Sequence, residues 1–374
     1  MCNEAISFAP GRVELLGNHT DYNQGLVLSA AIHLGVTVRA RKDSSNLITV
    51  SSATNGRRAE IDIPSIARLH TESWANYPLG VIETLRQTGF PLGGTTIDID
   101  SNLPLGAGLS SSAALEVATA FALRELYRLP LDPMQIAKLC QRAENEFVGV
   151  QCGLLDQASS VFGQAGKAIL LDFRSVTAEP VGLPSEVAIL LLASGIPHAL
   201  TGGEYNERRE QCARAAALLG VTALRETTTA AVRAAKMDPV VQRRALHITG
   251  ENERVSRGIK ALRRDDPETF GQLMFESHRS SRDNFENSTP ALDCLVEIAE
   301  QTSGVYGSRL TGGGFGGSTV SLVSRAQADQ IKESMVEQYF ERMGIHSSSI
   351  LTLPSQGAVI LASSSDETTN SNSG

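Results

Sequence analysis

The chain has 374 residues, of which 41% are hydrophobic. A chain with this many hydrophobic residues usually forms more than one hydrophobic core, so two domains are expected. Its 33 Lys and Arg residues against 41 Asp and Glu residues give a formal net charge of -8. This charge excludes a general positive field for holding nucleic acid or an anionic membrane, and any anionic ligand must be bound by local groups.

The five cysteines are an odd number, widely spread, and form no CxxC pair, which is typical of free thiols in a reducing compartment. The N-terminal residues contain no basic stretch followed by an apolar run of signal-peptide length. No apolar run approaches the ~20 residues that span a bilayer. We therefore expect a soluble protein of the cytoplasm.

Strand-like and helix-like segments alternate along the chain without an obvious repeat. β-branched or alternating runs predict strands at 35–43, 47–53, 95–101, 168–176, 187–194 and 318–324. Helical apolar spacing predicts helices at 113–127, 133–147, 204–219, 251–263 and 326–343. The mixture predicts an α+β protein and not a regular βαβ array.

The segment 178–186 contains two prolines and a glycine that interrupt the strand pattern, so a domain boundary is predicted there. This gives an N-terminal domain over 1–183 and a C-terminal domain over 184–362. Residues 363–374 are polar and lack apolar side chains, which predicts a disordered tail.

The N-terminal segment 11–25 concentrates Arg12, Asn18, His19 and Asp21 between two apolar, strand-like pieces. Donors and acceptors gathered on one loop suit a hydroxyl-rich ligand, because each hydroxyl is paired and a wrong epimer leaves polar groups unpaired. The alternative is a polar turn with local side-chain to backbone bonds.

The segment 103–114 places glycines and serines between a predicted strand and a predicted helix. Gly106 and Gly108 allow the backbone to approach a ligand, and the N-terminus of the helix attracts phosphate oxygens. Three consecutive serines, Ser110 to Ser112, exceed what a helix cap requires, although a plain cap is the alternative. The chain has no GxxxxGK[ST] motif, so any ATP phosphates must be bound by this different loop.

The segment 312–317 matches GxGxxG in form, but β-branched alternation follows it. A dinucleotide fingerprint requires its glycines to open a helix. We expect a glycine-rich turn close to a ligand or to the phosphate loop.

Two carboxylates need interpretation. Asp156 stands between apolar and small residues, where a carboxylate is a helix cap, a structural acceptor or a functional group in a cleft. Glu144 lies on a predicted helix, where a solvated side chain is the ordinary expectation.

Taken together, these segments resemble the GHMP kinase superfamily and, within it, the galactokinase family. GRVELLGNHTDYNQGLVLS is similar to the galactokinase signature, PLGAGLSSSAA to the superfamily's phosphate loop, and RLTGGGFGGSTVSLV to its third glycine-rich motif. WANYPLGVI, CGLLDQASSVFG, GEYNERREQC and GENERV are also similar, so the resemblance runs from about residue 9 to residue 323.

The resemblance implies a two-domain GHMP kinase fold, with an N-terminal domain like domain 2 of ribosomal protein S5 and the active site between the domains. It implies transfer of the γ-phosphoryl group of ATP, with Mg²⁺, to the anomeric hydroxyl of galactose. A monomer or weak homo-oligomer is expected.

The same resemblance assigns roles to individual positions. Asp156 matches the catalytic aspartate and Arg12 the arginine beside it. The implied sugar-binding positions are Asn18, His19, Asp21, Gly153 and Tyr205. The implied nucleotide-binding positions are Gly106, Gly108, Ser110 and Ser111, with Trp74 in the stretch that adjoins the adenine pocket. The implied magnesium-binding positions are Ser112 and Glu144.

Asn18 departs from the pattern, because galactokinases usually have GEHTDY where this chain has GNHTDY. In the family that glutamate contacts O6 of the sugar. Asparagine keeps an acceptor and gains two donors but loses the charge, so a sugar such as galacturonate is the alternative substrate.

Two further alternatives follow from the resemblance. A non-catalytic sugar and ATP sensor is disfavoured because Ser112 and Ala113 are present, whereas the known sensors have lost this Ser-Ala dipeptide. A kinase of mevalonate or homoserine is disfavoured by the polar cluster at residues 19–22 and by Tyr205, which favour a sugar as the substrate.

Overall fold

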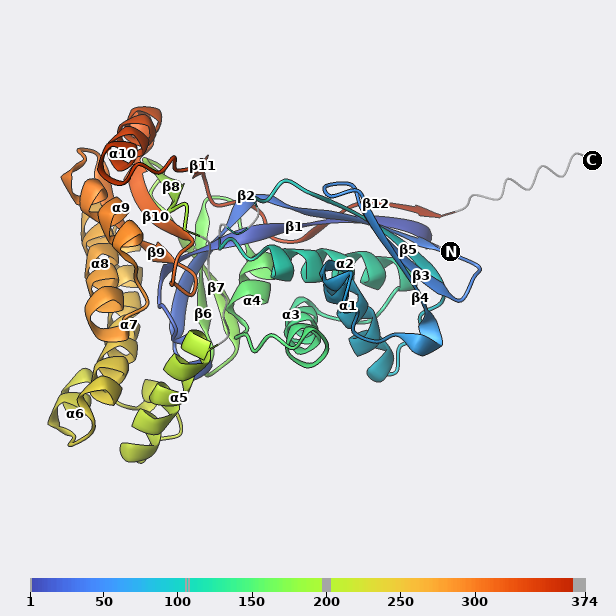
Figure 1. Cartoon of the computed structure of the whole chain (residues 1–374), viewed down its shortest axis with the longest axis horizontal. Coiled ribbons are helices and arrows are strands. Elements are labelled where there is room, and N and C mark those ends of the chain that lie inside the picture. The colour runs from blue at the N-terminus through green and yellow to red at the C-terminus, as the bar shows by residue number, and fades with distance from the viewer. Residues whose placement is uncertain (1, 105, 107, 197–202, 366–374) are drawn as a thin grey trace, which may run out of the picture.

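The computed structural model describes residues 2–104, 106, 108–196 and 203–365. The molecule is elongated, with the N-terminal half of the chain at one end and the helices of the C-terminal half at the other (Figure 1). Two long strands, β1 (Cys2–Leu16) and β2 (Leu26–Lys42), run along the middle.

Eight strands of the described chain form the first sheet. Its main order is β12-β1-β2-β5-β3-β4, while β6 pairs with β2 and β7 pairs with β6. The pairing is antiparallel except between β3 and β5. The bounds of the other members are β3 Leu47–Ser52, β4 Arg57–Asp62, β5 Thr95–Ser101, β6 Lys167–Asp172, β7 Thr177–Gly182 and β12 Val359–Ser365.

Helices cover one face of this sheet (Figure 1), and α2 (Ser111–Tyr127) packs directly on β1 and β2. The alanines of α2 are buried, so this helix can lie close to the strands and bury its apolar side chains in one core. The others are α1 Asn76–Gln87, α3 Pro133–Arg142 and α4 Leu155–Phe162, with short helical turns η1 Asp21–Asn23, η2 Ile63–Ser65, η3 Ser73–Ala75 and the π-helical η4 Ala143–Val148.

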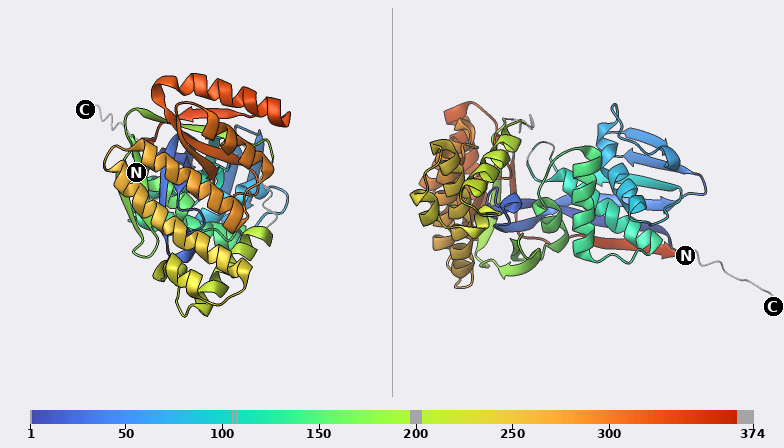
Figure 2. Two further views of the ribbon diagram at one scale, coloured as in Figure 1. Left: turned by 90° about the vertical axis from the view of Figure 1, so that its left-hand side faces the viewer. Right: turned by 90° about the horizontal axis from the view of Figure 1, so that it is seen from below.

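A second, four-stranded antiparallel sheet has the order β11-β8-β10-β9. Its strands are β8 Val187–Ala193, β9 Val305–Thr311, β10 Ser318–Ser324 and β11 Ser349–Thr352. Figure 2 shows the C-terminal helices at the same end of the molecule as this sheet. They are α5 Gly203–Leu218, α6 Thr229–Ala234, α7 Pro239–Leu262, α8 Pro267–Ser280, α9 Pro290–Gln301 and α10 Ala328–Met343, with η5 Leu224–Glu226, the π-helical η6 Ser281–Phe285 and η7 Arg325–Gln327. None of the helices in the described part of the chain has the length and apolarity to span a membrane.

The α+β prediction is confirmed, and each predicted strand and helix overlaps an observed element. The predicted helix 133–147 instead ends at Arg142 and continues as the π-helical η4. Helix α7 begins at Pro239, twelve residues before the predicted start at 251, because Asp238 caps it by accepting hydrogen bonds from Val240 and Val241. Helices α8 and α9 were not anticipated, although each begins with a proline after a side-chain cap.

The C-terminal strand pairs with a strand of the predicted N-terminal domain. The first sheet's run of strands stops with β7 and the second sheet begins with β8, on either side of residue 183. However, β12 returns to the first sheet and pairs with β1, so residues 359–362 do not belong to the second sheet. Residues 363–365, predicted to be disordered, are the end of this strand. Its serines can pair through the backbone at a sheet edge without burying apolar side chains. Residues 366–374 of the predicted tail lie outside the described residues.

Candidate active site

A cleft of about 540 Å³ contains every predicted site residue except Trp74. It is lined by β1, the β1–β2 loop, the phosphate loop, the start of α4, the start of α5 and the turn between β9 and β10. Segments from both sheets therefore meet around one cavity. Trp74 lies on η3, where it packs, partly buried, against the hydrophobic core, and its indole N–H donates to Glu72.

Asp156 is held by two partners that approach its carboxylate from different sides. Arg12 donates from Nε to Oδ1 at 2.8 Å, and its Nη2 lies 2.7 Å from the same oxygen. Ser110 Oγ donates to Oδ2 at 2.6 Å. Arg12 also donates from Nη1 to the carbonyl of Gly108 at 2.8 Å. These bonds join the predicted acid, its arginine and the phosphate loop in one arrangement.

The phosphate loop has the backbone conformation that its glycines permit. Gly106 and Gly108 have φ of 70° and 73°, and Ser110 has φ of 58° immediately before α2. Ser110 does not cap the helix with its side chain, because that hydroxyl is bonded to Asp156. The plain-cap alternative is therefore wrong for Ser110. The first two residues of α2, Ser111 and Ser112, line the cleft.

His19 also lines the cleft, and both of its ring nitrogens have hydrogen-bond partners. Nδ1 lies 2.9 Å from Tyr22 Oη and Nε2 lies 3.0 Å from the carbonyl of Gly313. Its ring also lies against the rings of Tyr205 and Phe285. Burial lowers the pKa of His19 to about 4, so the imidazole is neutral and fixes the shape of this part of the cleft.

Asp21 and Gly153 fit against one another. Burial raises the pKa of Asp21 to about 7, with hydrogen bonds from backbone N–H groups opposing the rise. A Cβ atom at residue 153 would overlap Asp21 Oδ2, so only glycine leaves room for this carboxylate. Tyr205, on the first turn of α5, completes the group.

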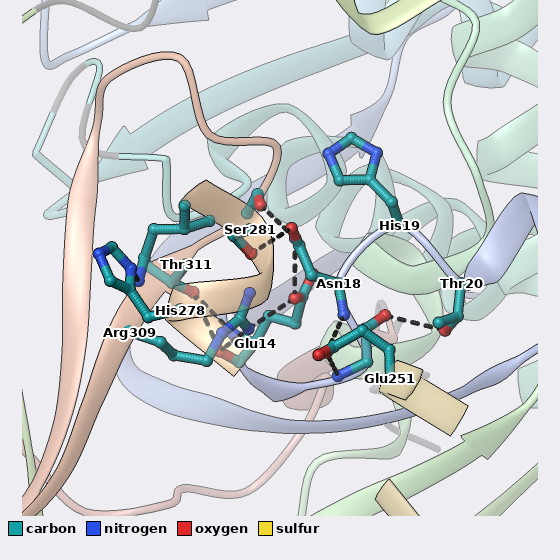
Figure 3. Close-up of polar contacts among 12 residues, drawn as sticks. Glu14, Asn18, His19, Thr20, Glu251, His278, Ser281, Arg309 and Thr311 are labelled. Atoms are coloured by element: carbon teal, nitrogen blue, oxygen red, sulfur yellow. Dashed lines mark hydrogen bonds and ion pairs between the residues drawn. The ribbon is translucent and has the colours of Figure 1, made fainter. Parts of the chain in front are cut away.

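Asn18 uses its whole side chain in bonds within the protein (Figure 3). Nδ2 donates to Glu14 Oε1 at 3.0 Å and to the carbonyl of Gly312 at 2.8 Å. Oδ1 accepts from Asn287 Nδ2 at 3.0 Å and lies 3.5 Å from Ser281 Oγ. An amide has two donors and two acceptor sites, so no polar capacity of Asn18 is left over for a ligand in this conformation.

Ser112 and Glu144 both line the cleft. The expectation of a solvated Glu144 is wrong, because the π-helical η4 turns it inward and leaves it buried. Burial raises its pKa, and hydrogen bonds from Cys152, Ser112 and Gln157 oppose the rise. No cluster of three metal-ligating His, Cys, Asp or Glu side chains occurs among the described residues. One hydroxyl and one carboxylate nevertheless suit Mg²⁺, which commonly takes one or two protein oxygens together with phosphates and water.

Sequence reasoning missed two carboxylates. Glu116 lies one helical turn after Ser112 and is fully buried, and Gln157 Nε2 donates to both Glu116 at 3.2 Å and Glu144 at 2.7 Å. Glu14 lines the cleft from β1. The spacing in the sequence could have indicated both residues. Glu116 is four residues after Ser112 and so lies on the same face of a helix, and Glu14 is two residues after Arg12 and so lies on the same face of a strand.

The glycine-rich segment 312–317 is the turn between β9 and β10, as predicted. A Cβ atom at Gly312 would lie 3.5 Å from the carbonyl of Gly108 and 3.9 Å from Arg12 Nη2, so this turn does pack on the phosphate loop.

Family models match at residues 76–164 (GHMP kinases N terminal domain), 2–42 (galactokinase galactose-binding signature) and 259–341 (GHMP kinases C terminal). The structure of Lactococcus lactis galactokinase complexed with galactose is 32% identical with a TM-score of 0.92, over 96% of this chain and 95% of that one. The chain belongs to the galactokinase family of GHMP kinases.

More distant GHMP kinases share the fold of this galactokinase-family chain. Mevalonate kinase from Methanococcus jannaschii is 20% identical with a TM-score of 0.69, over 95% of this chain and 98% of that one. Homoserine kinase from Cytophaga hutchinsonii is 17% identical with a TM-score of 0.65, over 96% and 98%. The two-domain GHMP kinase fold expected from the sequence is thereby confirmed.

Proposed function

We propose that the chain is a galactokinase, which transfers the γ-phosphoryl group of ATP to the anomeric hydroxyl of galactose and releases galactose 1-phosphate and ADP. The observation that carries this proposal is the position of Asp156, bonded to Arg12 on one oxygen and to Ser110 of the phosphate loop on the other. The acid therefore stands where a bound sugar and the ATP phosphates would meet.

Each part of the cleft supplies one requirement of phosphoryl transfer, which depends on positioning and charge stabilisation. Asp156 accepts or steers the proton of the anomeric hydroxyl. Arg12 orients Asp156 and places positive charge beside the transferred group. The N-terminus of α2 and the loop glycines bind the phosphates.

Mg²⁺ would be held by Ser112 and Glu144 and would neutralise charge on the phosphates when bound. The sugar would lie among His19, Asp21, Gly153 and Tyr205, at the end of the cleft away from α2. The cytoplasmic location and the monomeric or weakly associated state remain predictions.

An ADP-release assay with galactose, galacturonate, arabinose and N-acetylgalactosamine tests this function, with Asp156→Asn as control. We expect galactose to give the highest kcat/KM. Asp156→Asn should lower kcat by roughly 10²-fold or more while still binding ATP and unfolding at a similar temperature. Galacturonate turnover more than ~10-fold better than galactose, about 1.4 kcal/mol in transition-state binding, would reverse the substrate assignment. ATP binding without ADP release for any sugar would favour the sensor.

A further inference from the structure

Glu14 lines the cleft with its carboxylate, on the same face of β1 as Arg12. It lies on β1 two residues after Arg12, and the pairing with β2 is regular between Arg12 opposite Ala31 and Glu14 opposite Ser29. Residues i and i+2 of a strand point to the same face, about 7 Å apart. Arg12 and Glu14 therefore both face the cleft, and both line it.

The contacts of Glu14 fix one oxygen and leave the other available. Oε1 accepts from Arg309 Nη1 at 2.7 Å and from Asn18 Nδ2 at 3.0 Å (Figure 3). Oε2 accepts no hydrogen bond from any of the described residues, yet it is not among their fully enclosed unpaired atoms. The side chain is only 3% exposed. Its small remaining surface therefore borders the cleft.

The separation along β1 matches the dimensions of a hexose. Arg12 and Asp156 define the end at which the anomeric hydroxyl reacts. A carboxylate about 7 Å farther along the same strand face meets the opposite edge of the pyranose ring, which carries the C3, C4 and C6 hydroxyls.

We propose that Glu14 is a specificity-determining residue, an inference that rests on the proposed function. Its Oε2 accepts a hydrogen bond from one hydroxyl on the ring edge opposite C1. Asn18 and Arg309 are then positioning residues that orient this carboxylate. The charge at residue 14 also repels a sugar that carries a carboxylate on that edge. The uronate alternative suggested by Asn18 is therefore disfavoured by Glu14, which lies on β1 and is hydrogen-bonded to Asn18.

Monodeoxy sugars test this assignment through a ratio measured within each protein, so that losses of stability or of active fraction cancel. The kcat/KM for galactose is divided by that for its 3-deoxy, 4-deoxy and 6-deoxy analogues, for wild type and Glu14→Gln. A hydrogen bond to a charged acceptor is expected to give wild type a ratio of roughly 10- to 100-fold for one analogue. In Glu14→Gln that ratio should fall roughly 3- to 10-fold, because a neutral acceptor binds the hydroxyl less strongly than a charged one. The ratios for the other two analogues should be the same as in wild type.

Galacturonate gives a readout in the opposite direction. Its kcat/KM relative to galactose should rise at least about threefold in Glu14→Gln, because removal of the charge removes the repulsion. Asn287→Ala is the matched control, since it breaks a bond to Asn18 in the same network and leaves the Glu14 carboxylate in place. Its deoxy ratios should follow wild type.

The outcomes separate this inference from the proposed function. Suppose that wild type turns over galactose. If the three deoxy ratios of Glu14→Gln equal those of wild type, or if Asn287→Ala lowers the same ratio to the same extent, the role of Glu14 is contradicted while the proposed function stands. Absence of ADP release with galactose in wild type would contradict the proposed function and this inference together.

Discussion

At the scale of single residues, burial favours the neutral forms of His19, His247 and Asp21. The pKa of His19 is lowered to about 4 and that of His247 to about 3, while the pKa of Asp21 is raised to about 7, in each case mainly by loss of water. Because burial disfavours whichever form is charged, the acid and the histidines shift in opposite directions.

His247 gives a pH-dependent prediction. It lies within α7, bonded to Ser280 Oγ and the carbonyl of Asn18. Its folded pKa lies below the unfolded value near 6.5, so its contribution is complete above pH 6.5 and is lost as pH falls toward 3. Between pH 7 and pH 5, wild type should lose about 2 kcal/mol more unfolding free energy than His247→Gln. Denaturant unfolding of both proteins at each pH measures this, and parallel curves would contradict it.

Gly153 provides a second residue-level prediction. Gly153→Ala places a methyl group on the partly buried Asp21 carboxylate, so the carboxylate or the start of α4 must move. Since small displacements of binding groups are costly, kcat/KM for galactose should fall at least ~10-fold with little change in ATP affinity. Gly182→Ala adds a methyl group where no atom lies within 4 Å and is the control. An active Gly153→Ala enzyme would show that Asp21 does not need this position.

At the scale of elements, the phosphate loop depends on backbone conformation as much as on side chains. Gly108 and Gly166 share a φ of 73°, but only Gly108 borders the cleft. Alanine at either position costs about 1 kcal/mol of stability. Only Gly108→Ala should raise KM for ATP, because its carbonyl is bonded to Arg12. Thermal unfolding and ADP-release kinetics of both variants test this, and equal KM values would contradict it.

The elements also show what the sequence can predict. Local patterns sufficed for α2, for β5 and for the turn after β9, since glycines, serines and periodic apolar residues act over a few positions. Asp156, Arg12 and the loop came from long motifs, yet the bonds that join them span 144 and 46 residues. The burial of Glu144 could not be predicted, because its side chain points inward only as a result of the π-helical turn η4. The role of Asn18 could not be judged without Asn287, which lies 269 residues away.

At the scale of the whole molecule, a buried ion pair joins the two sheets. Glu14 of β1 and Arg309 of β9 lie 2.7 Å apart, with side chains 3% and 0% exposed. Glu251 of α7 accepts from the backbone N–H groups of Gly17 and Asn18 beside it. The β1–β2 loop, which we propose binds the sugar, is thus fixed to the C-terminal half of the chain.

Arg309→Met tests the strength of this connection. It leaves the Glu14 carboxylate buried without its cation, and such a loss costs about 3–5 kcal/mol. The double variant Glu14→Leu/Arg309→Met should recover most of that stability, because no uncompensated charge remains. Denaturant unfolding of wild type and the two variants provides the comparison. A loss below about 1 kcal/mol in Arg309→Met would show that water or another group compensates Glu14.

The pairing of β1 with β12 places Cys2 opposite Ser365, and this has a consequence for synthesis of the chain. At about 5–20 residues per second, β1 waits on the order of 20 to 70 seconds for its outer partner to leave the ribosome. During that time its edge is open to pairing with other chains. The outer edge of β1 is therefore open to other chains until β12 pairs with it, even though the residues that line the cleft are all made before β12.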